Sequence, residues 1–376
     1  MTVQFKKNIN TLVILYLLIL PHTVYSIINS KDENMYFLSL LVVMVLLFVN
    51  QFKSIIKTLY KAELLFVIIL CTLSIITSIA HGRMSPGLAF IAPFVTYIGY
   101  VFIRNKSINF NLKIFNVVFI FLYVYFYIIY FGILPDFIYR SNFDEDLIVF
   151  ESASSNGISI ALNITLYSYL ILNYFFKQKR ERDIFIIALI NFIFIVIQQS
   201  RAGLIVGLVL LFISIYELYG SRIKKYLFYV GIPAIILVAT FSDYITNYLS
   251  LIGGMSGIET YMANERKFAA VDFFNGLNIN NFIFGYSPGT SFNGLSYTFN
   301  VFLDFWSTYS FLGLSIFVFI LIRRFILWKK YKFPIYYFLP FLFYAFVESW
   351  FFPMYWDVII YLLIFVKHEK FSKFPI

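Results

Sequence analysis

Residues 64–80 read LLFVIILCTLSIITSIA, a run of seventeen residues without a charged side chain. A helix needs about 20 predominantly apolar residues to cross the ~30 Å hydrocarbon core of a bilayer. The apolar run is continuous and does not alternate with a period of two, which excludes a strand of a membrane β-barrel. The stretch therefore predicts a membrane-spanning helix.

The composition extends this prediction to the whole chain. Hydrophobic residues make up 61% of the 376 residues and charged residues 13%, against about 45–50% and about 25% in soluble globular proteins. We therefore expect an all-α polytopic membrane protein, with residues 1–376 forming a single integral membrane domain. Its apolar stretches predict about twelve transmembrane helices, of which the last is short enough to be re-entrant: 11–28, 35–50, 64–80, 87–103, 114–131, 156–176, 184–200, 202–219, 226–241, 303–322, 334–350 and 355–366.

The distribution of charge predicts the orientation of these spans. If the N-terminus is cytoplasmic, the segments inside the cell carry 23 basic and 5 acidic residues, and the segments outside carry 6 basic and 14 acidic residues. Basic residues concentrate in cytoplasmic loops, so we expect both termini to be cytoplasmic. The net charge of +10 comes from short basic runs between spans and not from one basic face, so we expect no nucleic-acid partner.

Cysteine and histidine are too sparse for a metal centre or a disulfide framework. The chain has one cysteine, Cys71, which lies within a predicted span, and its three histidines are far apart at His22, His81 and His368. We therefore expect no metal and no other cofactor.

Two segments outside the membrane are long enough to carry function: residues 132–155 form a smaller loop and residues 242–302 a large one. Within the large loop, residues 259–277 predict an amphipathic helix that ends at Asn275–Gly276 and carries Arg266 on its apolar face. Arg266 could extend from an interfacial helix to the lipid headgroups, or its guanidinium could bind a phosphate at the membrane surface. Next comes NNFIFGYSPGTSFNG (280–294), which predicts a turn-rich loop whose backbone approaches a neighbouring segment.

Arg201 is unusual because QQSRAGL (198–204) places it between two apolar spans with almost no loop. An arginine at the centre of the bilayer costs about 2.5–3.5 kcal/mol, and less near the surface. Ser200 could cap the following helix, so that a helix N-terminus and a guanidinium together bind phosphate. Alternatively, Arg201 extends to the outer headgroups. Arg83 and Arg140 lie in outside loops and could assist.

Three carboxylates at the outer surface need an explanation: Asp304, Glu348 and Asp272. Asp304 lies in the first turn of the tenth span, beside the large loop. There it could accept a proton from an incoming hydroxyl, or only interact favourably with the helix dipole. Glu348 is open to the same two interpretations. Four amide side chains within the spans predict hydrogen bonds between helices: Asn163, Asn191, Gln198 and Gln199.

Several motifs occur in an order that resembles a known superfamily. They are SRAG at 200–203, the arginine-bearing helix of the large loop, FGYSPG at 284–289 and NVFLDFWSTYSFLG at 300–313. Over about residues 198–316, their order and spacing resemble the O-antigen polymerase and ligase superfamily (Wzy and related lipid-linked glycan transferases). Ligases of this superfamily typically have His-Asn before a Phe-Leu pair. This chain has Asn300 and Phe302–Leu303, but Phe299 stands in place of the histidine, which favours the polymerase branch.

The resemblance implies a metal-independent glycosyltransferase of GT-C-like architecture in the bacterial inner membrane, acting in lipopolysaccharide biosynthesis. Such an enzyme polymerises oligosaccharide repeat units carried on undecaprenyl diphosphate at the periplasmic face, so membrane lipid and a polysaccharide chain-length regulator are implied partners. Arg201 and Arg266 would stabilise the departing diphosphate, assisted by Arg83 and Arg140. One carboxylate, in the order of preference Asp304, Glu348, Asp272, or no side chain at all, would accept the hydroxyl proton. Tyr297 and Asn300 would bind sugar.

Two alternatives remain open from the sequence. An O-antigen ligase is the nearest. A transporter or flippase of lipid-linked oligosaccharide also has about twelve spans, and it would have polar residues in mid-helix lining a cavity accessible from both sides. In this chain the unusual charged residues cluster outside, which favours the polymerase.

Overall fold

The computed structural model describes residues 61–83, 92–104, 112–131, 155–198, 201–220, 267–287, 290–293, 298, 300–330, 335–347 and 358–365. Within these ranges the regular structure is helical, without a β-strand. A helix at residues 267–275 lies in the large loop. The other helices are α4 (Lys61–Ala80), α5 (Ala92–Arg104), α6 (Ile114–Phe131), α8 (Ser155–Phe176), α9 (Glu181–Gln198), α10 (Arg201–Tyr219), α14 (Ile279–Phe284), α15 (Val301–Lys330), the 3₁₀ helix η7 (Ile335–Phe338), α16 (Leu339–Val347) and α17 (Val358–Phe365).

The predicted helical class is confirmed for the described part of the chain. The predicted spans 11–28, 35–50 and 226–241 lie outside it, and each of the other nine contains a helix where it is described. Two of the described helices are long and apolar enough to cross a membrane, Ala62–Ala80 and Val301–Leu327. Shorter apolar helices occur at Ile114–Val124, Gly203–Tyr219 and Ile335–Phe346.

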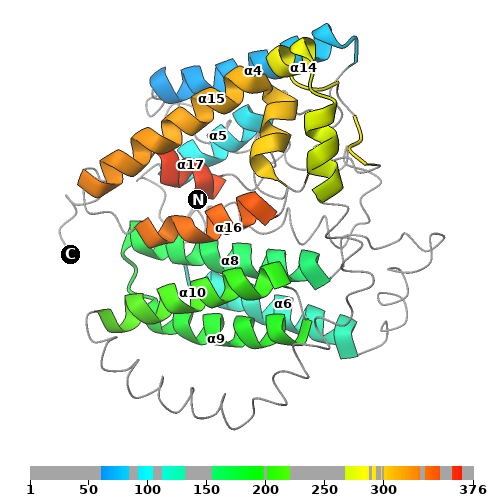
Figure 1. Cartoon of the computed structure of the whole chain (residues 1–376). Coiled ribbons are helices and arrows are strands. Elements are labelled where there is room, and N and C mark those ends of the chain that lie inside the picture. Colours follow the sequence, from blue (N-terminus) through cyan, green and yellow to red (C-terminus); the bar gives the residue numbers. More distant parts are fainter. Residues whose placement is uncertain are drawn as a thin grey trace, which may run out of the picture.

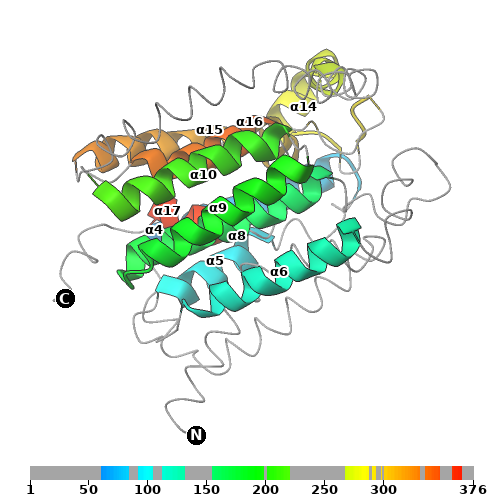
Figure 2. The same ribbon diagram turned by 90° about the horizontal axis from the view of Figure 1, so that it is seen from below.

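The helices form two groups that α16 joins (Figure 1; Figure 2 gives the view from below). In one group α4 packs against α5 and α15, and α17 packs against α5. In the other, α8, α9 and α10 pack against one another and α6 packs against α8 and α9. Because α16 packs against both α10 and α15, it connects the two groups.

The short helix α17 is buried on all sides because its sequence, VIIYLLIF, has no polar face. Tyr361 and Phe365 of α17 stack on each other, with ring centroids 5.3 Å apart. Phe365 also meets Phe66 of α4 at 5.7 Å and Tyr100 of α5 at 5.9 Å. This aromatic cluster fills the space between α4 and α5.

A buried ion pair connects the beginning of α4 with the end of α5. Arg104 Nη1 lies 2.6 Å from Glu63 Oε2, and it also donates to the Tyr100 hydroxyl at 2.8 Å. Nearby, Arg324 Nε donates to the carbonyl of Leu363 at 3.0 Å, which ties α15 to α17. Because these charged groups pair with or donate to polar partners, the apolar helix ends can bury them.

A buried hydrogen-bond network joins four helices at Asn163 of α8. Its Nδ2 donates to the Gly203 carbonyl of α10 at 3.0 Å and to the Tyr344 hydroxyl of α16 at 2.8 Å. Its Oδ1 accepts a bond from Asn191 Nδ2 of α9 at 3.1 Å. The predicted interhelical role is therefore confirmed for Asn163 and Asn191, whereas the side chains of Gln198 and Gln199 lie outside the description. The network holds the first turn of α10, which begins at Arg201.

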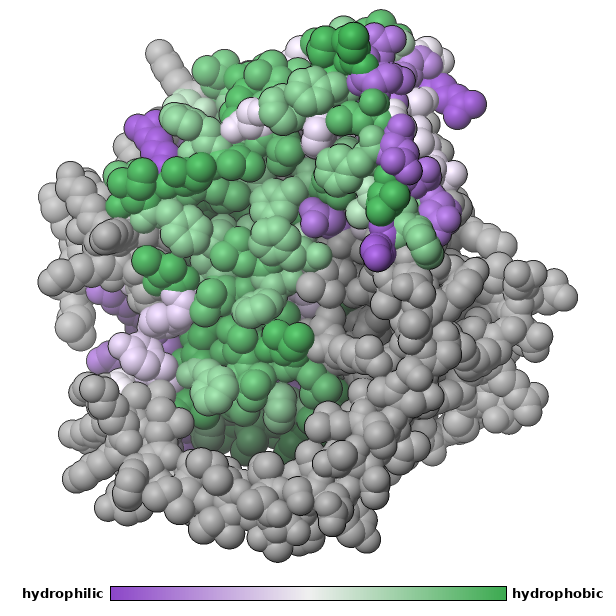
Figure 3. Space-filling view, in the orientation of Figure 1, coloured by the Kyte–Doolittle hydropathy of each residue, from purple (hydrophilic) through white to green (hydrophobic). Residues whose placement is uncertain are grey.

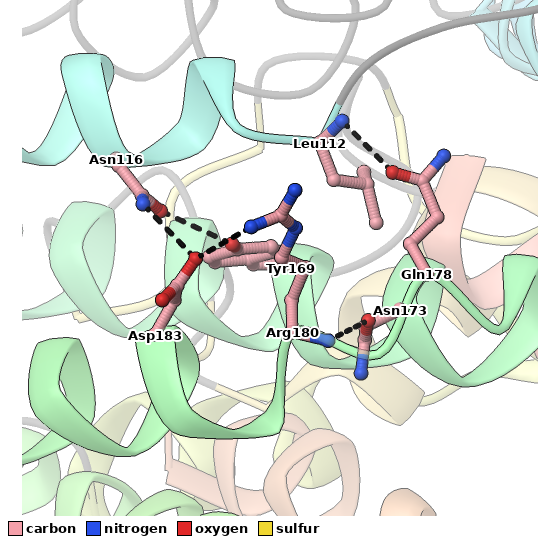
Figure 4. A network of polar contacts seen from close by, with 7 residues as sticks. All are labelled: Leu112, Asn116, Tyr169, Asn173, Gln178, Arg180 and Asp183. Atoms are coloured by element: carbon pink, nitrogen blue, oxygen red, sulfur yellow. Dashed lines mark hydrogen bonds and ion pairs between the residues drawn. The ribbon is translucent and has the colours of Figure 1, made fainter.

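A second polar network joins the beginnings of α6 and α9 to α8 (Figure 4). The Tyr169 hydroxyl donates to Asn116 Oδ1 at 3.1 Å, and Asn116 Nδ2 donates to Asp183 Oδ2 at 3.3 Å. Arg180 forms an ion pair with the same Asp183 oxygen at 3.2 Å, and its backbone N–H donates to Asn173 Oδ1 at 3.0 Å. These bonds fix the tight connection between α8 and α9.

Candidate functional site

The described part of the large loop packs against the beginning of α15. The helix of residues 267–275 lies within the predicted range 259–277. Its Phe273 ring is fully buried, with centroids 5.4 Å from Trp306 of α15 and 4.7 Å from Tyr286. Ala269, on the same face, is also fully buried, whereas Phe268 lies off that face and is exposed. The apolar face of this helix therefore contacts protein.

Gly285 brings the loop backbone into direct contact with α15. Its φ of +81° lies in a region that L side chains rarely adopt, and a Cβ there would lie 2.4 Å from the Ser307 carbonyl oxygen. The next residue, Tyr286, donates its backbone N–H to that oxygen at 3.0 Å. Trp306 Nε1 donates to the Phe282 carbonyl at 3.3 Å. This is the close backbone approach that the glycine-rich sequence predicts.

The end of α4 binds the same turn from the other side. The Thr77 hydroxyl donates to the Phe284 carbonyl, and His81 Nε2 lies 2.9 Å from the Gly285 carbonyl oxygen. Because a carbonyl only accepts, the histidine carries a proton on Nε2 in this bond. Arg83 is exposed two residues further on. The end of α4 therefore lies beside the loop and the beginning of α15.

Asp304 is the most constrained charged residue of this region. It is only 9% exposed, and its Oδ1 accepts two bonds from Thr298, one from the backbone N–H and one from the hydroxyl, both at 2.8 Å. Its other oxygen, Oδ2, is buried and has no hydrogen-bond partner in the described part of the chain. A buried oxygen left unpaired costs about 1–3 kcal/mol, or more when charged, so it requires an explanation.

A break in α15 separates Asp304 from the longer part of that helix. Ser310 has φ 67° and ψ 169°, which interrupts the helix between a short segment at 301–309 and a long segment at 311–330. Figure 1 shows the chain turning sharply there, with the long segment running alongside α4. Asn300 caps the short segment, because its Oδ1 accepts from the N–H groups of Phe302 and Leu303 at 3.0 and 3.3 Å.

Asp272 and Tyr286 order the loop around this segment. Asp272 is exposed, and its Oδ2 accepts the backbone N–H of Asn293 at 2.9 Å. The Tyr286 hydroxyl donates to the Phe273 carbonyl. Burial raises the pKa of the Tyr286 phenol, and the negative charge of Asp272 raises it further, so the phenol stays protonated and keeps this bond.

Of the predicted site residues, the structure brings four to this end of α4 and α15: Arg83, Asp272, Asn300 and Asp304. Four others, Arg140, Arg266, Tyr297 and Glu348, lie outside the described residues, although the helix of residues 267–275 begins directly after Arg266. For Arg201 the structure describes only the backbone, which opens α10.

Sequence reasoning missed Thr298 and His81 as parts of the site. The signal for Thr298 is only its position, two residues before Asn300, which caps the apolar helix. No comparable signal exists for His81, whose contact with Gly285 joins residues that are 204 positions apart.

The arrangement offers a carboxylate held by one oxygen, with the other oxygen buried and without a hydrogen-bond partner among the described residues. Among the described residues, no group of three His, Cys, Asp or Glu side chains comes together to hold a metal ion.

The chain matches no protein-family profile, no curated protein and no solved structure.

Proposed function

We propose that this chain is an O-antigen polymerase, a metal-independent glycosyltransferase of GT-C-like architecture with about twelve transmembrane helices in the bacterial inner membrane. It transfers the growing glycan between undecaprenyl-diphosphate-linked oligosaccharide repeat units at the periplasmic face. The observation that carries the proposal is the buried carboxylate of Asp304, which has one oxygen fixed by Thr298 and the other unpaired, within the FLDFW part of the resembling motif.

Asp304 acts as the general base in this reaction. The acceptor sugar hydroxyl donates its proton to Oδ2 while its oxygen forms the new bond to the anomeric carbon of the donor. The bond from that carbon to the diphosphate oxygen breaks, and the diphosphate leaves with the bonding electrons. Thr298 keeps the carboxylate in one orientation by binding Oδ1, so the unpaired oxygen is the one that meets the hydroxyl.

Arginines stabilise the diphosphate as it leaves, because charge-assisted bonds to phosphate oxygens are strongest from a guanidinium. Arg201 and Arg266 have this role, and Arg83 and Arg140 assist. Two observations support it: α10 begins at Arg201, and Arg83 is exposed two residues after His81, which contacts the loop beside Asp304.

The arrangement of helix ends supports the periplasmic position of the site. The end of α4 and the beginning of α15 lie together at the large loop, and the pair Glu63–Arg104 lies at the opposite end of α4. The charge distribution predicts the first of these ends outside the cell and the second inside, with both termini cytoplasmic.

The test is to introduce Asp304→Asn in the native host and to separate its lipopolysaccharide on gels. A general base contributes about 10²- to 10⁴-fold, so we expect the ladder of chain lengths to collapse to core plus one repeat unit. A normal ladder at normal protein level, measured by immunoblot, would refute the proposal. Core without any repeat unit would instead indicate a ligase.

Asp272→Asn is the matched comparison, because Asp272 is exposed and its Oδ2 binds a loop amide. We expect this variant to shorten the ladder much less than Asp304→Asn. The reverse result would identify Asp272 as the general base.

A flipping assay distinguishes the polymerase from a transporter or flippase. Fluorescent lipid-linked oligosaccharide is reconstituted with the protein in vesicles, and a polymerase leaves this substrate in its original leaflet.

A further inference from the structure

The short helix α14 presents an apolar face to the outside of the protein. Ile279 is 78% exposed and Ile283 50%, and Phe282 on the same face is partly exposed. Phe282 and Ile283 follow Ile279 by three and four residues, which places these three side chains on one side of the helix. Large apolar side chains gathered on a surface indicate a contact with lipid or protein.

The opposite side of α14 is polar and attached to the loop. Asn278 caps the helix, because its Oδ1 accepts the backbone N–H of Asn281 at 2.8 Å. Asn281 Nδ2 donates to the Gly276 carbonyl at 2.8 Å, whereas the exposed Asn280, three residues before Ile283, lies at the edge between the two sides. Helix α14 is therefore amphipathic, and its orientation is fixed by bonds on its polar side.

The apolar face of α14 continues onto the two helices that are long enough to cross a membrane. The Phe282 ring stacks on Phe311 of α15, with centroids 4.6 Å apart and planes inclined by 27°. On the other side, the Thr77 hydroxyl of α4 binds the Phe284 carbonyl. The neighbouring exposed apolar residues are Ile75, Ile76 and Ile79 on α4 and Phe311 and Leu312 on α15.

Figure 3 shows this surface from one side. Hydrophobic residues cover α4 and α15 and reach α14 at the top, and hydrophilic residues begin at the right-hand edge, over the helix of residues 267–275. The exposed sides of α4 and α15 would contact acyl chains in a bilayer, so a mainly apolar surface extends the lipid contact to α14. A protein partner on α14 would have to displace lipid from both long helices.

We infer that α14 lies in the membrane surface, with Ile279 and Ile283 among the acyl chains of one leaflet and Asn280 toward the headgroups. This contact is independent of the proposed glycosyl transfer, because it requires only apolar area. The contact of α14 with lipid holds the turn at Gly285 at the membrane boundary. Because Trp306 Nε1 donates to the Phe282 carbonyl, the helix segment that carries Asp304 is held at the same depth.

Fluorescence quenching in vesicles tests the inference. In the otherwise cysteine-free Cys71→Ser chain, Ile283→Cys and, separately, Asn280→Cys are labelled with the environment-sensitive dye NBD. The labelled proteins are reconstituted into phosphatidylethanolamine–phosphatidylglycerol vesicles with a spin-labelled lipid near the acyl carbonyl. An interfacial helix buries its apolar face about 5–10 Å deep, so we expect the label at 283 to be quenched at least about twofold more than the label at 280.

Iodide in the aqueous phase provides the reciprocal measurement, and we expect it to quench the label at 280 more than the label at 283. Equal lipid quenching at the two positions would overturn the inference. Shielding of 283 from both quenchers would also overturn it, because protein would then cover α14. Ile279→Cys repeats the measurement in case Ile283→Cys fails to fold, as judged by gel filtration.

Discussion

Thr298 binds one carboxylate oxygen of Asp304 twice, through its backbone N–H and its hydroxyl, each at 2.8 Å. The second oxygen is left buried without a partner in the described part of the chain. This asymmetry fixes the carboxylate in one orientation without using its full capacity to accept hydrogen bonds. It distinguishes Asp304 from an acidic residue that only interacts with a helix dipole, because the dipole alone requires no such clamp.

Thr298→Val removes one of the two clamping bonds while keeping the shape of the side chain. A hydrogen bond to a charged group contributes about 1.5–3 kcal/mol, so we expect the free energy of unfolding to fall by that amount. On the proposed function, the chain-length ladder should also shorten. Thermal unfolding in detergent and lipopolysaccharide gels measure the two effects.

Thr298→Ser, which restores the hydroxyl, is the control for that experiment and should recover most of both losses. A Thr298→Val variant with an unchanged ladder would show that the bond from the Thr298 hydroxyl to Asp304 has no effect on polymerisation.

Replacing Gly285 should separate the loop from α15. Gly285→Ala combines a backbone conformation that is nearly restricted to glycine with a Cβ 2.4 Å from the Ser307 oxygen. We expect the free energy of unfolding to fall by more than about 3 kcal/mol. The matched control is Gly220→Ala, where φ is +55° but no atom lies within 4 Å of the new Cβ. Conformation alone costs about 1–2 kcal/mol there. Equal losses in the two variants would contradict a close contact at Gly285.

Asn163→Leu removes three buried hydrogen bonds between helices at once. Such bonds in membrane proteins contribute about 0.6 kcal/mol on average, so we expect a loss of about 2 kcal/mol. Tyr344→Phe removes only one of the three and should cost about a third as much. Chemical denaturation in micelles gives both values, and similar losses for the two variants would argue against a shared network.

The ion pair Glu63–Arg104 should contribute much more to stability than Arg180–Asp183. The side chains of the first pair are 8% and 10% exposed, and those of the second are 32% and 27% exposed for Asp183 and Arg180. Breaking a buried pair costs about 3–5 kcal/mol, whereas an exposed pair contributes about 0–1 kcal/mol. Thermal unfolding of Arg104→Leu and Arg180→Leu compares them, and a larger loss for Arg180→Leu would contradict the assignment.

Arg201→Ala and Arg266→Ala test the proposed stabilisation of the diphosphate. Removing one donor to a developing negative charge typically costs about 10²- to 10³-fold in rate, so each variant should leave core plus one repeat unit on gels. The corresponding lysine variants should recover part of the ladder, because lysine keeps the charge but loses the planar fork of donors. Normal ladders in both alanine variants would remove these arginines from the site.

Much of the fold was predictable because it depends on local properties of the chain. The apolar run at 64–80 and its counterparts elsewhere predict helices, since a segment without charged groups must satisfy its backbone internally. The apolar face of the helix at 267–275 was predictable for the same reason, because Ala269 and Phe273 recur with the helical period. The break at Ser310 was not predicted, since serine in that conformation is held by its surroundings and not by its own preference.

The helical class of the described residues and the residue types near Asp304 followed from the sequence alone, because transfer free energies and backbone preferences act locally. Which groups meet became known only from the packing of the helices. Asn163 and Tyr344 are 181 positions apart, and His81 and Gly285 are 204 apart, yet each pair is joined by a hydrogen bond. Such contacts depend on which helix faces pack together. The packing is set by how well the side chains of distant segments fit one another, and a local sequence pattern does not contain that information.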